Sequence, residues 1–219
     1  MKFYRLVIDE GKRKKFAWAF PPFETDCVPV ECSVCGRKWN DSSYGMKKNI
    51  PYPITFTNNY FPDFMCCQGI DLVSQHMKDV IEESGMAVAK FAKMPVIGKS
   101  DFTKEQLKDL RDDYVVSKLH DEKPIYYRFN SDVGAVLHSD SNVVWVDSGE
   151  YVCKHCGYGV GYKQKDYFAP EYIQLDSWNG NDLFRVREFG GAFYCTEKFK
   201  MLCEQAKFTG IEFREVEAR

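Results

Sequence analysis

Two short cysteine motifs are the residues of this chain best suited to chemistry. The first is Cys32-Ser33-Val34-Cys35-Gly36, and the second is Cys153-Lys154-His155-Cys156-Gly157. The two sulfurs of a C-x-x-C turn can point to one metal ion, and two such turns supply the four thiolates of a tetrahedral zinc site. The glycine after each motif suits a backbone with positive φ, where a side chain would clash. We therefore predict one structural zinc, bound by Cys32, Cys35, Cys153 and Cys156.

Other interpretations of the two motifs stay open at this level. Single C-x-x-C turns also occur in redox proteins, so the motifs could be two independent thiol pairs. A catalytic zinc fits less well, because four thiolates leave no open position for water or substrate. His155 lies inside the second motif and could replace a cysteine as ligand. Since four cysteines are present, we expect His155 to point outward.

The remaining thiols and histidines form no recognisable catalytic motif. The four histidines lie far apart in sequence, and neither H-E-x-x-H nor H-x-E followed by P-C-x-x-C occurs. In the adjacent pair Cys66-Cys67, a nucleophile would need a lowered pKa and a nearby base, and His76 is the nearest histidine in sequence. We expect both thiols to be buried and structural, and we assign no role to Cys27, Cys195 and Cys203.

The composition predicts a soluble, cytoplasmic protein with reduced thiols. The chain has 219 residues, of which 44% are hydrophobic and 16% aromatic, enough for a substantial core. Its nine cysteines are an odd number, which fits poorly with a fully paired disulfide framework. The first ten residues mix charges into an apolar run and lack the apolar region of a signal peptide. No apolar stretch approaches the roughly 18 residues of a membrane span.

The charge balance bears on the class of partner. The 30 basic and 32 acidic residues give a net charge of −2, without the basic excess of a nucleic-acid binder. Lys12-Arg13-Lys14-Lys15 is a basic run, but its place in a charged turn favours a solvated hairpin over an anion contact. Nucleic acid is therefore an improbable partner on charge alone.

Three amphipathic helices are predicted to hold these residues in place. They cover residues 71–84, residues 104 to about 120, and the segment between residues 196 and 210. Capping residues mark their ends: Asp71 and Gly85 for the first, the capping box from Thr103 to Gln106 for the second, and Thr196 and Gly210 for the third.

Apolar runs between the helices predict strands, and the pattern gives the fold class. The strands cover residues 1–9, 16–20, 54–56, 86–91, 125–129, 143–146, 183–186, 192–194 and 211–216. Cap, helix, glycine and strand occur in this order twice, which suggests a βαβ-like unit used twice. We predict a single α+β domain over residues 1–219, with a mixed or antiparallel sheet and about three helices. Zinc knuckles at residues 28–39 and 150–162 would cross-link this domain through one split four-cysteine site.

With both motifs and the C-terminal segment considered, the chain resembles a bacterial family defined by two CxxCG motifs. The resemblance rests on the two motifs, on Asn181-Asp182-Leu183-Phe184, and on Phe208-Thr209-Gly210 to Phe213. Members of this family include immunity proteins, which bind and silence a toxin delivered between neighbouring bacteria. The resemblance implies that the four motif cysteines are the metal ligands, and it carries over no toxin-binding residue.

The resemblance favours an immunity protein that binds and neutralises a cognate toxin in interbacterial competition. Such binding needs an interface of roughly 800 Å² per partner. Zinc would be a structural cofactor, no residue would be catalytic, and no membrane would be involved. Two alternatives stay open: a zinc- or thiol-dependent enzyme, and a zinc-ribbon protein that binds nucleic acid.

Overall fold

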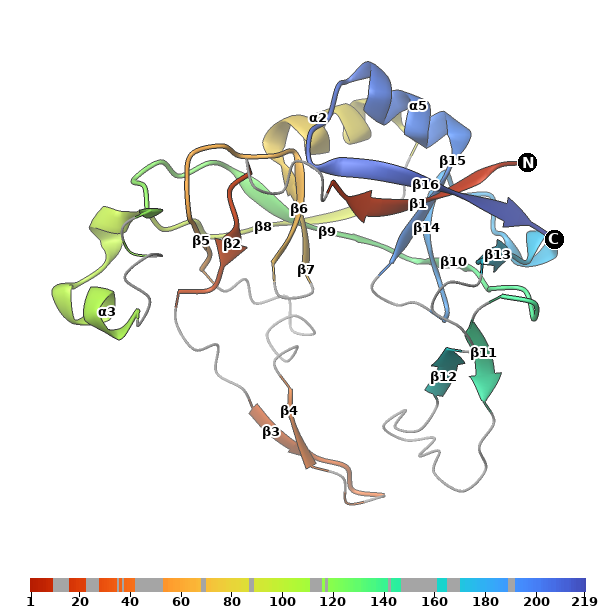
Figure 1. Ribbon diagram of the computed structural model, residues 1–219, viewed down its shortest axis with the longest axis horizontal. Coiled ribbons are helices and arrows are strands. Elements are labelled where there is room, and N and C mark those ends of the chain that lie inside the picture. Colours follow the sequence, from red (N-terminus) through yellow and green to blue (C-terminus); the bar gives the residue numbers. More distant parts are fainter. Residues whose placement is uncertain are drawn as a thin grey trace.

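The computed structural model has a mixed α+β fold, which confirms the predicted class (Figure 1). It describes residues 1–9, 16–22, 28–34, 36, 38–41, 53–67, 70–86, 89–110, 116, 118–141, 143–146, 161–164, 170–188 and 192–219. Within these residues there are three α-helices, α2 (Gln75–Ser84), α3 (Lys104–Asp109) and α5 (Glu197–Gln205). Two short 3-10 helices are also present, η1 (Lys99–Asp101) and η2 (Leu175–Ser177), and Val116 and Lys118 are helical as well. No helix of the described part is long and apolar enough to cross a membrane.

Two larger sheets and three strand pairs make up the β-structure of the described residues. The six-stranded sheet has the order β10 (Val133–Ala135), β14 (Leu183–Val186), β15 (Phe193–Thr196), β1 (Phe3–Ile8), β16 (Ile211–Ala218) and β13 (Tyr172–Ile173). The four-stranded sheet has the order β6 (Phe64–Cys67), β7 (Ile70–Ser74), β9 (Tyr126–Ser131) and β8 (Ala89–Lys93). The pairs are β2 (Ala19–Phe20) with β5 (Thr55–Phe56), β3 (Val28–Glu31) with β4 (Lys38–Asp41), and β11 (Val143–Val146) with β12 (Gly161–Gln164).

The two larger sheets repeat one topology. β7 and β8 both pair antiparallel with β9 and are connected by α2. In the same way, β15 and β16 both pair antiparallel with β1 and are connected by α5. The order β6-β7-β9-β8 therefore matches the order β14-β15-β1-β16. This confirms the βαβ-like unit used twice, with an antiparallel strand between the two parallel ones.

The middle strand of each unit comes from the other half of the chain, if β1 to β8 are called the first half and β9 to β16 the second. β1 lies among second-half strands, and β9 lies among first-half strands. Their registers correspond, because Phe3 is opposite Thr196 and Tyr126 is opposite Ser74. Their sequences also correspond, with Tyr-Arg at positions 4–5 and again at positions 127–128. Each half thus completes the sheet of the other.

The first helix starts later than its sequence predicts. Residues 70–74 form β7, and α2 begins at Gln75 with Ser74 as its N-cap, whose Oγ accepts a hydrogen bond from the Met77 N–H at 3.1 Å. Asp71 is therefore not the cap. Leu72 and Val73 are both fully buried, in two different core clusters, because they point to opposite faces of a covered sheet.

The N-terminal ends of the other two helices follow their sequence signals, but both helices end earlier than predicted: α3 ends at Asp109 rather than near residue 120, and α5 ends at Gln205, before Gly210. The Thr103 hydroxyl accepts from the Gln106 N–H at 3.1 Å, and the Gln106 side chain accepts from the Thr103 N–H at 2.8 Å, which confirms the capping box. α3 ends at Asp109, and residues 111–115 of its predicted extension lie outside the described residues. Thr196 caps α5, and Gly85 ends α2 with φ +62°.

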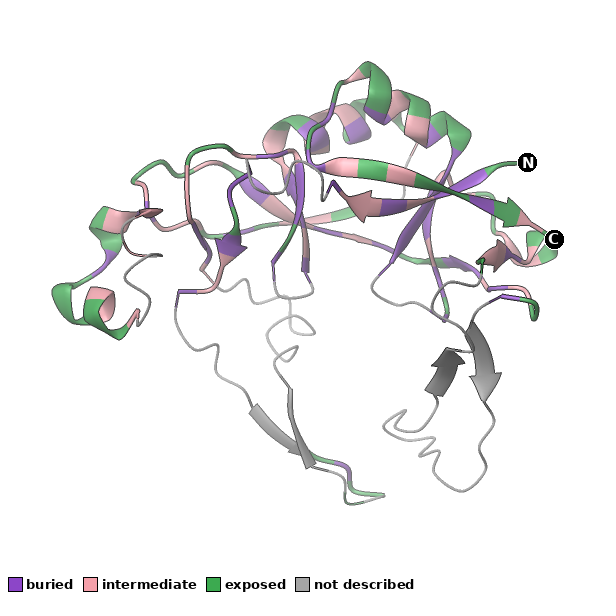
Figure 2. Cartoon of the chain, in the orientation of Figure 1, coloured by how far each residue is buried: buried purple, intermediate pink, exposed green. Residues whose placement is uncertain are grey.

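One core cluster joins the two larger sheets and the two longer helices. It contains apolar side chains from β1, β6, β7, β9, β14 and β15 together with the inner faces of α2 and α5. Figure 2 shows buried residues along these strands, and exposed residues on the outer faces of the helices. The members of this central core are Tyr4, Leu6, Phe64, Val73, Met77, Ile81, Phe129, Leu183, Phe193, Cys195, Phe199, Cys203 and Phe208.

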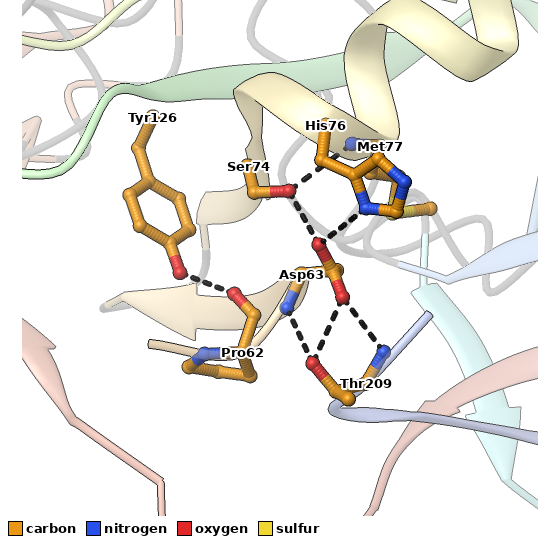
Figure 3. A network of polar contacts seen from close by, with 7 residues as sticks. All are labelled: Pro62, Asp63, Ser74, His76, Met77, Tyr126 and Thr209. Carbon is orange, nitrogen blue, oxygen red and sulfur yellow. Dashed lines mark hydrogen bonds and ion pairs between the residues drawn. The ribbon is translucent and has the colours of Figure 1, made fainter. Parts of the chain in front are cut away.

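Asp63, directly before β6, fastens the two halves together (Figure 3). Its Oδ1 accepts from the Ser74 hydroxyl at 2.7 Å, and its Oδ2 accepts from the N–H and the hydroxyl of Thr209, both at 2.9 Å. Burial by itself would raise the pKa of Asp63, but these hydrogen bonds outweigh it and hold the pKa below its usual value. The turn between α5 and β16 is thereby attached to the start of α2.

Gly210 lies at the closest approach of this turn to the first half. Its φ is +81°, and a Cβ added there would be 2.2 Å from the carbonyl oxygen of Phe64. The N–H of Phe64 also donates to the Thr209 carbonyl at 3.1 Å. A residue with a side chain would therefore be strained and would push the two segments apart.

We predict that Gly210→Ala lowers the free energy of unfolding by roughly 2–5 kcal/mol. About 1–2 kcal/mol comes from the left-handed backbone, and the rest comes from hydrogen bonds lost around Asp63. Gly180→Ala is the matched control, since Gly180 has φ +88° but open space at its Cβ position. Urea denaturation of both variants is the measurement. Equal losses for the two variants would contradict the tight contact.

Candidate metal centre

The first motif forms the end of the β3–β4 hairpin. Glu31 is opposite Lys38, and the motif lies between these two residues. Cys32 is buried, whereas the turn residues Ser33 and Val34 are exposed. Gly36 has φ +69°, and its N–H donates to the Cys32 carbonyl at 2.9 Å. The expected positive φ at this glycine is thus confirmed.

The second motif belongs to an equivalent place in the second half. β11 and β12 pair antiparallel, with Val146 opposite Gly161, and the motif lies between them in sequence. In Figure 1 the β3–β4 and β11–β12 pairs project from the same side of the molecule, away from α2 and α5. The two motifs therefore connect the strands of two hairpins, one from each half.

Of the four predicted ligands, Cys32 is the one whose position is described. Cys35, Cys153 and Cys156 lie outside the described residues, as does His155. Among the side chains that are described, no group of three or more Cys, His, Asp or Glu residues is arranged to hold a metal ion. The four-cysteine site therefore stays a prediction.

The other described thiols divide into one exposed and three buried groups. Cys67, Cys195 and Cys203 are buried, and burial raises the pKa of the Cys203 thiol to about 12. These three are inert structural thiols. Cys66 is exposed, so the expectation that both adjacent cysteines are buried is wrong for this residue. The reason is the alternation of β6, which points Cys66 and Cys67 to opposite faces of the sheet.

The described histidines lie in separate parts of the structure. The Nδ1 of His76 is 3.3 Å from Asp63 Oδ1, and its ring packs edge-on against Phe208 at 5.2 Å. The Nδ1 of His138 accepts from the Asp140 N–H at 3.2 Å. His120 contributes its backbone carbonyl to the N–H of Lys99. His76 therefore belongs to the junction between the halves.

A polar cluster between the two larger sheets is not evident from the sequence. Asp71 is opposite Cys66 in the β6–β7 ladder, and it interacts electrostatically with Arg185 of β14. Burial raises the pKa of Asp71 to about 7, and the charge of Arg185 counteracts this only in part. The Arg185 guanidinium lies over the Phe193 ring at 4.8 Å, and its Nε is buried without a hydrogen-bond partner in the described structure.

This cluster has some of the groups that thiol chemistry requires. A carboxyl with a pKa near 7 can accept a proton at neutral pH, and Cys66 is the exposed thiol beside it. Sequence reasoning missed Asp71 because it suits a helix cap equally well. The signal that could have identified it is the apolar pair Leu72-Val73 directly after it, which is typical of a strand covered on both faces.

Comparisons with known proteins add no relatives. No protein-family model matches the chain, and the search of curated proteins gave no match.

We predict that Asp71→Asn stabilises the protein increasingly as the pH rises from 4 to 8. The unfolded carboxyl ionises with a pKa of 3.8, whereas the folded protein holds the proton up to about pH 7. Ionisation therefore costs the folded state free energy over this interval, at most about 4 kcal/mol. Asparagine does not ionise and avoids this cost. Urea denaturation at a series of pH values measures the difference between the variant and the parent protein.

Asp101→Asn is the control of opposite sign. The hydrogen bond from Lys123 lowers the pKa of this exposed carboxyl, so its replacement should destabilise the protein above the usual carboxyl pKa. If Asp71→Asn is also destabilising at pH 8, the assignment of a raised pKa to Asp71 is wrong.

Proposed function

We propose that Cys32, Cys35, Cys153 and Cys156 hold one structural zinc ion. The observation that carries this proposal is the location of each C-x-x-C-G motif between the strands of a hairpin, at equivalent places in the two halves. Two hairpins that each present two cysteines supply a complete tetrahedral site. The positive φ of Gly36 and the burial of Cys32 fit the donor set, because a zinc-bound thiolate needs a tight turn and shielding from water.

Zinc supplies cross-linking in this site and no catalysis. Four thiolate ligands close the coordination sphere, so the ion has no position left for substrate. For such a site, the chain has to bring the ends of the two hairpins together. In a reducing compartment, such a site connects distant segments where a disulfide would not persist.

The purified protein should contain about one zinc per chain, and both Cys32→Ser and Cys153→Ser should lose it and unfold at a lower temperature. Metal binding contributes to folding free energy when the site exists only in the folded state. Elemental analysis and thermal unfolding measure the two effects. Cys66→Ser is the matched control, since this exposed thiol lies outside the motifs and its loss should leave the zinc in place. Folded protein without zinc would contradict the proposal.

We further propose that the zinc-linked protein is an immunity protein that neutralises a cognate bacterial toxin. Support comes from the resemblance in the two CxxCG motifs and in the C-terminal segment. Two residues of that segment have structural tasks here, because Asp182 accepts a hydrogen bond from the cap Thr196 at 2.7 Å and Thr209 binds Asp63. These two residues therefore have structural roles in this chain, and the resemblance assigns no residue to toxin binding.

Co-expression with the toxin encoded by a neighbouring gene tests this function. We expect the chain to protect the producing cell and to co-purify with the toxin, because neutralisation by binding requires a stable complex. Protection assays and pull-down are the two measurements. Cys66→Ser, which keeps all four motif cysteines, should protect as well as the parent. The immunity function is rejected if the chain gives no protection and forms no complex with the toxin, whatever its zinc content.

A further inference from the structure

A pocket of about 610 Å³ lies between the C-terminal part of α5 and the start of β16. This volume is within the range of small-molecule sites. Its apolar lining comes from both ends of the chain, since Phe16 precedes β2 while Ile211 and Phe213 belong to β16. Ile211 and Phe213 are only partly buried although they pack on the central core, so an apolar surface is open at this place.

Lys207, on the edge of this pocket, has a strained backbone. Its φ is +56°, and among the described residues it is the only one other than glycine with a positive φ. It follows the cap Ala206 of α5, and its N–H donates to the Glu204 carbonyl at 3.1 Å. A left-handed conformation costs roughly 1–2 kcal/mol for a residue with a Cβ. Glycine would adopt it without this cost.

The other half of the chain has glycine at the equivalent position. Gly85 follows α2 with φ +62°, and its N–H donates to the Glu82 carbonyl at 3.2 Å, as Lys207 does to Glu204. The neighbouring Lys78–Glu82 and Lys200–Glu204 ion pairs correspond as well. The two halves therefore share this helix end, and the lysine is a departure from a pattern that glycine fulfils.

Among the charged side chains that line the pocket, Lys207 forms no ion pair within the described part. Lys200 is paired with Glu204 at 2.6 Å. Asp9 and Glu212 each interact with another residue of the chain. Lys207 forms no ion pair or hydrogen bond through its ammonium group with any side chain of the described part. The pocket thus combines an apolar floor with two lysines and three carboxyl groups, and Lys207 is the one of these charged groups that has no side-chain partner in the described part.

We propose that this pocket binds a small-molecule carboxylate with an apolar body, and that Lys207 pairs with the carboxylate. The apolar body would contact Phe16, Ile211 and Phe213, and the strained lysine would be retained for its charge. The two helix-end carbonyls beside it are already capped by the N–H groups of Lys207 and Phe208, so they do not compete for the ammonium group. This site requires neither the zinc ion nor a toxin.

The probe is 3-phenylpropionate, with the uncharged 3-phenylpropionamide as its matched ligand. Both are titrated to millimolar concentration into the full-length protein and followed by NMR chemical shifts. We expect the carboxylate to bind more tightly than the amide and to shift signals of pocket residues. If the amide binds equally well, or if neither ligand shifts a pocket residue, the proposal is wrong.

Three substitutions separate the charge of Lys207 from its backbone strain. Lys207→Gly and Lys207→Asn remove the charge and suit a left-handed backbone, whereas Lys207→Arg keeps the charge. The first two should weaken 3-phenylpropionate binding roughly two- to fivefold, the contribution of a solvent-exposed ion pair, and leave the amide unaffected. Lys207→Arg should bind like the parent.

Stability gives the second readout of the same variants. Lys207→Gly should raise the unfolding temperature while it weakens binding, because it removes strain and charge together. This opposite movement of stability and affinity is not expected if the lysine only packs at the helix end. Unchanged carboxylate affinity in Lys207→Gly would overturn the proposal, whatever its unfolding temperature.

Discussion

The hydrogen bonds accepted by the Asp63 carboxylate are the interaction that joins the two halves. It accepts hydrogen bonds from Ser74, which starts α2, and from Thr209, which precedes β16. One side chain thereby sets the position of a helix in the first half and of a turn in the second. Gly210 extends this constraint to the backbone, because its lack of a Cβ lets the turn approach Phe64.

The repeated topology assigns one cysteine motif to a hairpin of each half, which the spacing of the cysteines alone does not show. Each half contains a hairpin with one motif and a β-α-β crossover, and each crossover receives its middle strand from the opposite half. A shared metal between the hairpins would add a third connection to the exchanged strands and the Asp63 junction. The two halves also differ at one helix end. Lys207 has a positive φ at the position where the first half has Gly85.

Local signals were sufficient for some elements and failed where packing decides. Thr103 and Thr196 were recognisable as caps, because a hydroxyl before an amphipathic run has one structural use there. Asp71 was assigned wrongly, since Asp71 and Ser74 are both good caps and only the pairing of β7 with β9 distinguishes them. In the candidate metal site, Gly36 was predictable from its motif. The near-neutral pKa of Asp71 was not, because it arises from burial between strands that are distant in sequence.

The exchange of β1 also affects how the protein can form during synthesis. Phe3 leaves the ribosome early, but its neighbour in the sheet, Thr196, is made almost at the end. At about 5–20 residues per second, the first strand waits roughly 10–40 seconds for its partners. Until then its apolar residues, including the fully buried Phe3, are exposed to solvent and to other nascent chains. A chaperone that shields β1 during this interval would therefore protect it from association with other chains.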